Sequence, residues 1–131
     1  MNNFETGEKL LQGVERHYEQ MLNAYYNKWW NIVVRRVQET EELSLKAVLK
    51  IFGVEYPKVH DVGSLFVKFV KEKKLEVNEE VLERIKNISE KLAKERAPAF
   101  YGEKNYTEKD AKEAMKGAKE ILEFCKKYFV K

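Results

Sequence analysis

Residues 28–53 read KWWNIVVRRVQETEELSLKAVLKIFG and carry the longest helical pattern in the chain. Apolar and small side chains recur in it every three to four residues, which is the spacing of one face of an α-helix. Gly53 follows the last of them, at a position where glycine commonly ends a helix. The pattern predicts a helix from about Lys28 to Phe52. Its expected inner face consists of Trp30, Val33, Val37, Ser44, Val48 and Ile51.

The same spacing continues on both sides of this helix, and strand-like alternation is nearly absent. A first helix is expected from about Phe4 to Leu22, before the segment NAYYN loosens the pattern. Three polar residues of the type that favours helix N-termini predict the starts of three further helices: Asp61, Asn78 and Thr107. Both prolines, Pro57 and Pro98, are expected in loops. The sequence therefore predicts one all-α domain over residues 1–131, an antiparallel up-and-down bundle of four to five helices.

Length and composition narrow the class of protein. A chain of 131 residues that is 44% hydrophobic is long enough to bury one core. No apolar run is long enough to span a membrane, and the N-terminus lacks the pattern of a secretory signal, so we expect a cytoplasmic protein. Cys125 is the single cysteine, and no histidine, cysteine and aspartate spacing typical of a metal site occurs. We therefore predict no metal and no cofactor.

The charged residues are numerous but balanced. They make up 36% of the chain, mostly as lysine and glutamate, which is a composition common in thermophiles. The net charge is only +3, with both signs mixed along the chain. Charge by itself therefore does not predict a nucleic-acid-binding protein, which usually has a distinct basic stripe.

Bundle topology predicts that two distant loops are neighbours. In an up-and-down path, the loop after the second helix (53–60) and the loop after the fourth (96–106) lie at the same end. Five side chains would then gather there: His60, Asp61, Arg96, Tyr101 and Tyr106.

Three stretches of the sequence together resemble the HEPN domain family. Residues 38–66, QETEELSLKAVLKIFGVEYPKVHDVGSLF, resemble the family signature of a helix, a turn and a His-Asp pair. Residues 95–103, ERAPAFYGE, are similar to the helix-ending motif of a prokaryotic branch, and residues 106–122, YTEKDAKEAMKGAKEIL, resemble its last helix. The matching residues of the first stretch are Gln38, Glu42, Leu45, Lys46, Ala47, Leu49, Gly53, Pro57, His60, Asp61 and Val62.

The resemblance implies a helical bundle that commonly forms homodimers. It also implies binding of nucleotide or RNA, often beside a minimal nucleotidyltransferase in a toxin–antitoxin-like module. One class of HEPN domains are metal-independent ribonucleases with an arginine followed, after four to six residues, by a histidine. Here Arg96 is present, but Tyr101, Gly102 and Glu103 occupy the positions of that histidine. We therefore expect a non-catalytic HEPN protein that binds nucleotide or single-stranded RNA and acts with a nucleotidyltransferase.

Two other functions stay open. A ribonuclease toxin could use Arg96 together with His60 or Tyr101, because proton transfer requires the right geometry and not proximity in sequence. A structural helical adaptor would bind protein and no nucleic acid. Neither reading is excluded by the sequence.

Four residues are the expected ligand contacts: Arg96, Phe100, Tyr101 and His60. A guanidinium matches phosphate oxygens, and exposed aromatic rings stack on bases. Each residue also has a structural interpretation. Arg96 could be a surface residue whose positive charge is favourable near a helix C-terminus. Phe100 and Tyr101 could anchor their loop to the core. His60 could pack beneath its own loop and form a hydrogen bond with the backbone.

Four residues are expected at an interface with a second copy or a partner: Trp29, Trp30, Glu42 and Lys46. Adjacent tryptophans on a helix point about 100° apart, so one of them must lie at an edge or in an interface. Glu42 and Lys46 have i,i+4 spacing, which suits either a surface ion pair or a polar interface. Glu41 falls close to the inner face, where a carboxylate needs a partner.

Overall fold

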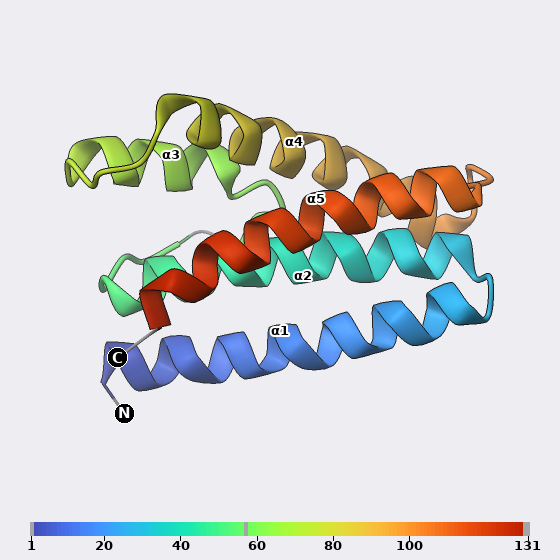
Figure 1. Ribbon diagram of the computed structural model, residues 1–131, viewed down its shortest axis with the longest axis horizontal. Helices are drawn as coiled ribbons and strands as arrows, with labels where there is room; N and C mark the ends of the chain where they lie inside the picture. Colours follow the sequence, from blue (N-terminus) through green and yellow to red (C-terminus); the bar gives the residue numbers. More distant parts are fainter. Residues whose placement is uncertain (1, 57, 130–131) are drawn as a thin grey trace.

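The computed structural model describes residues 2–56 and 58–129 and consists of helices joined by loops (Figure 1). The elements are α1 (Asn3–Tyr26), α2 (Trp30–Ile51), α3 (Gly63–Glu72), α4 (Glu79–Tyr101), α5 (Glu108–Lys126) and the short 3-10 helix η1 (Lys127–Phe129). No strand occurs in these two ranges. The predicted all-α bundle of four to five helices is confirmed.

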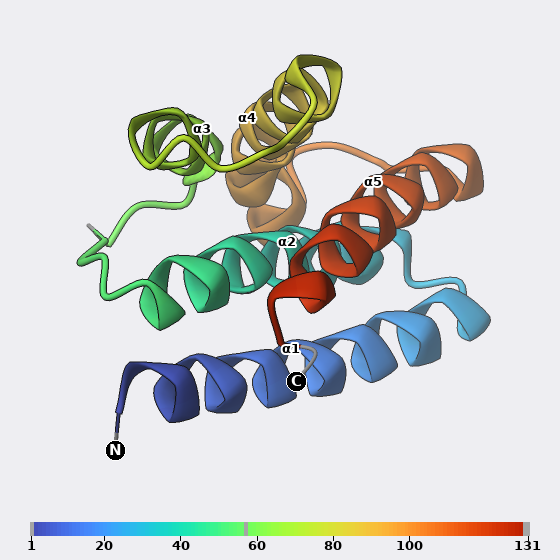
Figure 2. The same ribbon diagram turned by 60° about the vertical axis from the view of Figure 1, so that its left-hand side comes forward.

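Helix α2 is the centre of the bundle. It packs against α1 on one side and against α4 and α5 on the others, while α3 and α4 form a layer above it (Figures 1 and 2). Its predicted inner face is buried except at its two ends, where Trp30 and Ile51 are half-buried. Helix α1 approaches α2 closely at Gly7, because a Cβ added there would lie 2.3 Å from Ile51 Cγ2. Each fully buried Val or Leu contributes about 1.5–3 kcal/mol, so this central helix accounts for much of the core.

Two of the three polar residues that were predicted to begin helices do so, and the third prediction needs a correction. The Asn78 side chain accepts a hydrogen bond from Glu80 N (2.7 Å), and Thr107 forms a capping box with Asp110, as predicted. The third helix is different, because its N-cap residue is Val62 and not Asp61. Asp61 stands one position earlier and accepts a weaker hydrogen bond from Gly63 N (3.3 Å).

Two helix ends also lie further along the chain than predicted. Helix α1 continues through the segment NAYYN as far as Tyr26, because Ala24 and Tyr25 pack against the core around α2. Helix α4 continues past Pro98, which is therefore inside a helix and not in a loop. Gly102 ends α4 in the left-handed region (φ +67), and its N–H donates to the Pro98 carbonyl. Pro57, the other proline expected in a loop, lies outside the described residues.

The described residues between α2 and α3, 52–56 and 58–62, take an unexpected course and are called the loop 52–62. It leaves the C-terminal end of α2 and turns back along that helix, so that α3 begins beside the middle of the bundle (Figure 1). The α4–α5 loop lies at the other end of α2, where Asn31 Nδ2 donates to the Lys104 carbonyl (3.0 Å). The expectation that these two loops are neighbours at one end of the bundle is therefore wrong. The prediction assumed that short loops alone determine the path of the chain. Instead, His60 contacts Glu42 on α2 and Asp61 accepts a hydrogen bond from Ser89 on α4, and these contacts hold the loop against the bundle.

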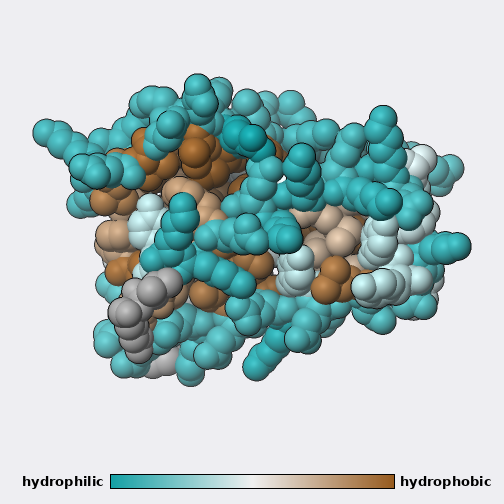
Figure 3. Space-filling view, viewed as in Figure 1, coloured by the Kyte–Doolittle hydropathy of each residue, from teal (hydrophilic) through white to brown (hydrophobic). Residues whose placement is uncertain are grey.

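The face of the molecule drawn in Figure 3 is mainly hydrophilic. Figure 3 shows hydrophobic side chains on one face chiefly between the first turns of α4 and the C-terminal half of α5. Within the described ranges, no helix is long and apolar enough to cross a membrane.

Candidate functional site

Four polar side chains meet where α2, α4 and the loop 52–62 come together. Gln38, fully buried on α2, is at their centre. Its Oε1 accepts a hydrogen bond from Arg96 Nη1 (2.6 Å), and its Nε2 donates to Glu42 Oε1 (2.8 Å). The same Nε2 lies 3.5 Å from the carbonyl oxygen of His60. We call Gln38, Glu42, His60 and Arg96 the polar seam.

Glu42 contacts two further nitrogen-bearing side chains, His60 and Lys46. His60 Nδ1 lies 2.9 Å from Glu42 Oε1, and Lys46 Nζ donates to Glu42 Oε2 at 3.0 Å. Burial by itself would raise the pKa of Glu42. The hydrogen bonds from Gln38, Lys46 and His60 outweigh burial and hold that pKa below its ordinary value. Glu42 is therefore a carboxylate at neutral pH and orients the His60 ring.

A second set of contacts fixes the end of the loop that carries His60. The Ser89 hydroxyl, fully buried on α4, donates to Asp61 Oδ1 (2.8 Å) and accepts from Gly63 N (3.0 Å). A Cβ added at Gly63 would lie 2.6 Å from Ser89 Cβ, so only glycine permits this approach of α3 to α4. The loop position beside α2 is thus determined by α4.

The surface beside the seam has uncompensated positive charge and exposed aromatic rings. Among the described residues, neither Arg96 nor Arg35 forms an ion pair, because Arg96 is bonded to a neutral amide and Arg35 lies over a ring. The Arg35 guanidinium carbon is 4.4 Å from the centroid of Phe100, which is 55% exposed. The adjacent Tyr101 is 71% exposed. Two half-buried cations and two exposed rings therefore lie along α2 and α4.

The comparisons with known proteins agree with this architecture. The HEPN domain family matches residues 8–128. The chain belongs to the HEPN domain family. The crystal structure of an archaeal HEPN homologue superposes on this HEPN domain with a TM-score of 0.71 at 22% identity, over 95% of this chain and 98% of that chain. That likeness shows the fold. Comparison with curated proteins gives no match.

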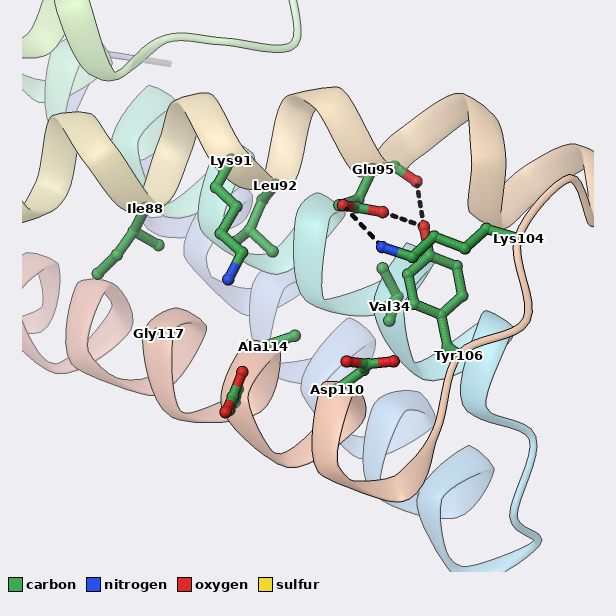
Figure 4. A pocket seen from close by; sticks show the side chains of 11 residues that line it. Val34, Ile88, Lys91, Leu92, Glu95, Lys104, Tyr106, Asp110, Ala114 and Gly117 are labelled. Atoms are coloured by element: carbon green, nitrogen blue, oxygen red, sulfur yellow. Dashed lines mark hydrogen bonds and ion pairs between the residues drawn. The ribbon is translucent and has the colours of Figure 1, made fainter.

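The HEPN domain brings some of the expected ligand contacts together. His60 and Arg96 share Gln38 as a partner, although they lie beside the middle of α2 and not at one end of the bundle. Phe100 lies one helical turn beyond Arg96, with its ring 4.9 Å from that of Tyr101. Tyr106 is separate from them. Its hydroxyl donates to Glu95 on the side of α4 that faces α5 (Figure 4).

The four residues expected at an interface have different surroundings. Trp29 is 53% exposed, whereas Trp30 is half-buried and packs edge-on against Tyr25 (5.5 Å between ring centroids). Glu42 and Lys46 are largely buried and paired with each other, so their contacts in this HEPN domain are internal. Of the four, Trp29 has the largest free surface.

Sequence reasoning missed the central residue of the seam. Gln38 was noted only as part of the family signature, and Arg35 was not considered as a ligand contact. The spacing of Gln38, Glu42 and Lys46, four residues apart, places all three on one helical face and could have indicated a polar row. That Arg96 on α4 would contact the row could not be read from spacing within α2.

Glu41 is the remaining polar feature of α2. It is fully buried, and neither of its carboxyl oxygens has a hydrogen-bond partner among the described residues. Burial raises the pKa of Glu41 well above its ordinary value, and the Glu42 and Asp61 carboxylates raise it further, while Ser89 and Lys46 act weakly in the opposite direction. The core around Glu41 therefore disfavours its ionised form. In the described ranges, no group of three histidine, cysteine, aspartate or glutamate side chains could hold a metal ion.

Proposed function

We propose that this HEPN domain is a non-catalytic protein that binds single-stranded RNA, or a nucleotide, along the seam between α2 and α4. The observation that carries the proposal is the hydrogen bond from Arg96 to the buried Gln38 amide. A neutral partner fixes the direction of the guanidinium and leaves its positive charge available for a phosphate.

The neighbouring residues suit the rest of such a ligand. Phe100 and Tyr101 are exposed aromatic residues on which bases can stack, a contact worth about 1–3 kcal/mol per base in single-strand binders, although Arg35 already covers one face of the Phe100 ring. Arg35 supplies a second cation beside the Phe100 ring. The ligand class is therefore one that alternates phosphate and base.

Replacing Arg96 by alanine is expected to weaken RNA binding about tenfold, the loss typical of one charge-assisted hydrogen bond. The measurement is fluorescence polarisation of labelled single-stranded RNA at several salt concentrations. The slope of the logarithm of affinity against the logarithm of salt concentration should also become shallower, by about the amount that one phosphate contact contributes. Arg84→Ala is the matched control, because Arg84 lies on the same helix but is exposed and paired with Glu120. Wild-type protein that shows no salt-dependent binding would instead favour the structural adaptor.

A ribonuclease is the second candidate, and one observation favours it. The His60 side chain is 51% exposed and is held by Glu42, while the His60 backbone carbonyl lies 3.5 Å from Nε2 of Gln38, the side chain to which Arg96 donates. A positioned imidazole and a guanidinium on one surface are the groups that cleavage of RNA by acid–base chemistry needs. If this candidate is right, purified protein cleaves single-stranded RNA in EDTA. His60→Ala and Arg96→Ala would each abolish that cleavage, whereas the non-catalytic proposal expects no cleavage by any of the three proteins.

The proposal also includes two protein partners, which the resemblance to the HEPN family suggests. They are a second copy of the chain and a minimal nucleotidyltransferase. The exposed Trp29, with Tyr26 and Ile32 nearby in sequence and also exposed, supports an interface at the α1–α2 turn. Co-expression with a nucleotidyltransferase, followed by co-purification, tests the second partner.

A further inference from the structure

A pocket separates α4 from α5 and shares no residue with the polar seam. Its volume is about 210 Å³, more than the 150 Å³ or so that holds a benzene molecule in an engineered cavity. Its floor is apolar and comes from α2, α4 and α5, chiefly Val34, Leu92 and Ala114 (Figure 4). At one end, Gly117 meets Ile88 so closely that an added Cβ would lie 3.2 Å from Ile88 Cγ2. The pocket can therefore take an apolar group of side-chain size.

Most polar groups around the pocket already have partners within the chain. Glu95 accepts hydrogen bonds from the Tyr106 hydroxyl and from Lys104 Nζ (3.3 Å). Asp110 accepts from the Thr107 backbone N–H (2.9 Å), which holds the pKa of Asp110 below its ordinary value. These contacts fix the wall beside the α4–α5 loop before any ligand arrives, which lowers the entropy cost of binding.

Two charged groups at the pocket have no such partner. Lys91 on α4 and Glu113 on α5 line opposite walls as exposed side chains. Neither forms an ion pair or hydrogen bond among the described residues, and the charge of Lys91 helps to lower the pKa of the nearby Asp110. The Lys91 side chain points across the pocket toward α5 (Figure 4). One cation and one anion, neither held by a direct hydrogen bond, thus flank an apolar floor.

The balance of charge restricts the ligand. Three carboxylates and two ammonium groups line the pocket, so a phosphate or another multiply charged anion would be repelled. A plain hydrocarbon would leave Lys91 and Glu113 unused. A zwitterion satisfies both with charge-assisted hydrogen bonds while its apolar part fills the floor.

We propose that this pocket binds a small zwitterion with an apolar side chain, of the free α-amino-acid type. Its carboxylate contacts Lys91, its ammonium group contacts Glu113, and its side chain lies on Val34, Leu92 and Ala114. The proposal is independent of RNA binding at the polar seam.

Titration calorimetry of the full chain with L-leucine and L-phenylalanine tests the site. We expect saturable binding of at least one of them, weakened about tenfold or more in Lys91→Met and in Glu113→Gln. Lys116→Met and Glu83→Gln are the matched controls, because both residues are exposed, lie outside the pocket and form no ion pair or hydrogen bond with any residue that the structure describes. Thermal unfolding of each variant confirms that it is folded, and amide chemical-shift changes on ligand addition should map to the pocket walls.

Two analogues separate a zwitterion site from a merely apolar cavity. Isocaproate lacks the ammonium group of leucine, and isoamylamine lacks its carboxylate, so each should bind about tenfold more weakly than leucine. The proposal is overturned if neither amino acid binds, if isocaproate or isoamylamine binds as tightly as leucine, or if the pocket variants behave like their controls.

Discussion

Replacing Glu42 by leucine is expected to lower the free energy of unfolding by about 3–5 kcal/mol at neutral pH, the cost of breaking a buried ion pair from one side. Lys46 would keep its charge in a largely buried position without its partner at 3.0 Å. His60 and Gln38 would each lose a hydrogen bond at the same time. Urea denaturation followed by circular dichroism measures the change.

The chain offers a matched control for this variant. Glu90 and Lys94 have the same i,i+4 spacing on α4 and lie 3.2 Å apart, but both are exposed. Glu90→Leu should change stability by no more than about 0.5 kcal/mol. The double variant Glu42→Leu, Lys46→Met should recover most of the loss, because it removes both charges. Equal losses in Glu42→Leu and Glu90→Leu would mean that burial of the pair has no energetic consequence.

The pKa of Glu42 also predicts how the loss depends on pH. In the folded protein this pKa lies below the ordinary value of 4.5, so the ionised group stabilises the fold above that value. The stabilisation disappears as the pH falls through the folded pKa. The difference between wild type and Glu42→Leu should therefore shrink in acid.

The neighbouring substitution Glu41→Met is expected to act in the opposite direction and to stabilise the protein by about 1–3 kcal/mol at pH 7. That is the usual cost of a buried polar group without a partner. Both Glu41 oxygens lack a hydrogen bond among the described residues, and methionine has a similar length. The pKa of Glu41 is raised, so the unfolded chain ionises first as the pH rises above 4.5. Wild type should then lose stability with rising pH, and the gain from methionine should grow.

Denaturation at mildly acidic and mildly alkaline pH measures this effect, with Glu41→Gln as the control. Glutamine cannot ionise but keeps a polar group without a partner, so it should remove the pH dependence and give a smaller gain. If Glu41→Met instead destabilised the protein at both pH values, Glu41 would have a favourable partner in solution, such as ordered water.

These two glutamates show how finely helix geometry separates chemical environments. Glu41 and Glu42 are adjacent, so their side chains point about 100° apart around α2. One points into the core, where burial raises its pKa, whereas the other meets Gln38, Lys46 and His60, whose hydrogen bonds lower its pKa. The sequence indicated that Glu41 is a carboxylate in need of a partner, but it did not distinguish a core position from an interface position.

Local patterns predicted the helices of this HEPN domain and most of their ends. Periodicity located the inner face of α2, and the polar side chains of Asn78 and Thr107 marked two helix starts, because each acts on backbone groups within one turn. The prediction that Pro98 lies in a loop was wrong because it also rested on a local preference. A proline usually marks a helix boundary, yet α4 continues for three more residues to Tyr101, and Gly102 caps it.

Residue patterns along the chain account for the set of helices, for the spacing of Gln38 and Glu42 on one face, and for the absence of a histidine at positions 101–103. Packing between distant segments accounts for the course of the loop 52–62 back along α2 and for the contact of Arg96 with Gln38. The reason is that these arrangements depend on contacts between residues far apart in the chain, such as the hydrogen bond of Ser89 to Asp61. No local preference within either segment encodes such a contact, so the polar seam exists only once α2, α4 and the loop have packed together.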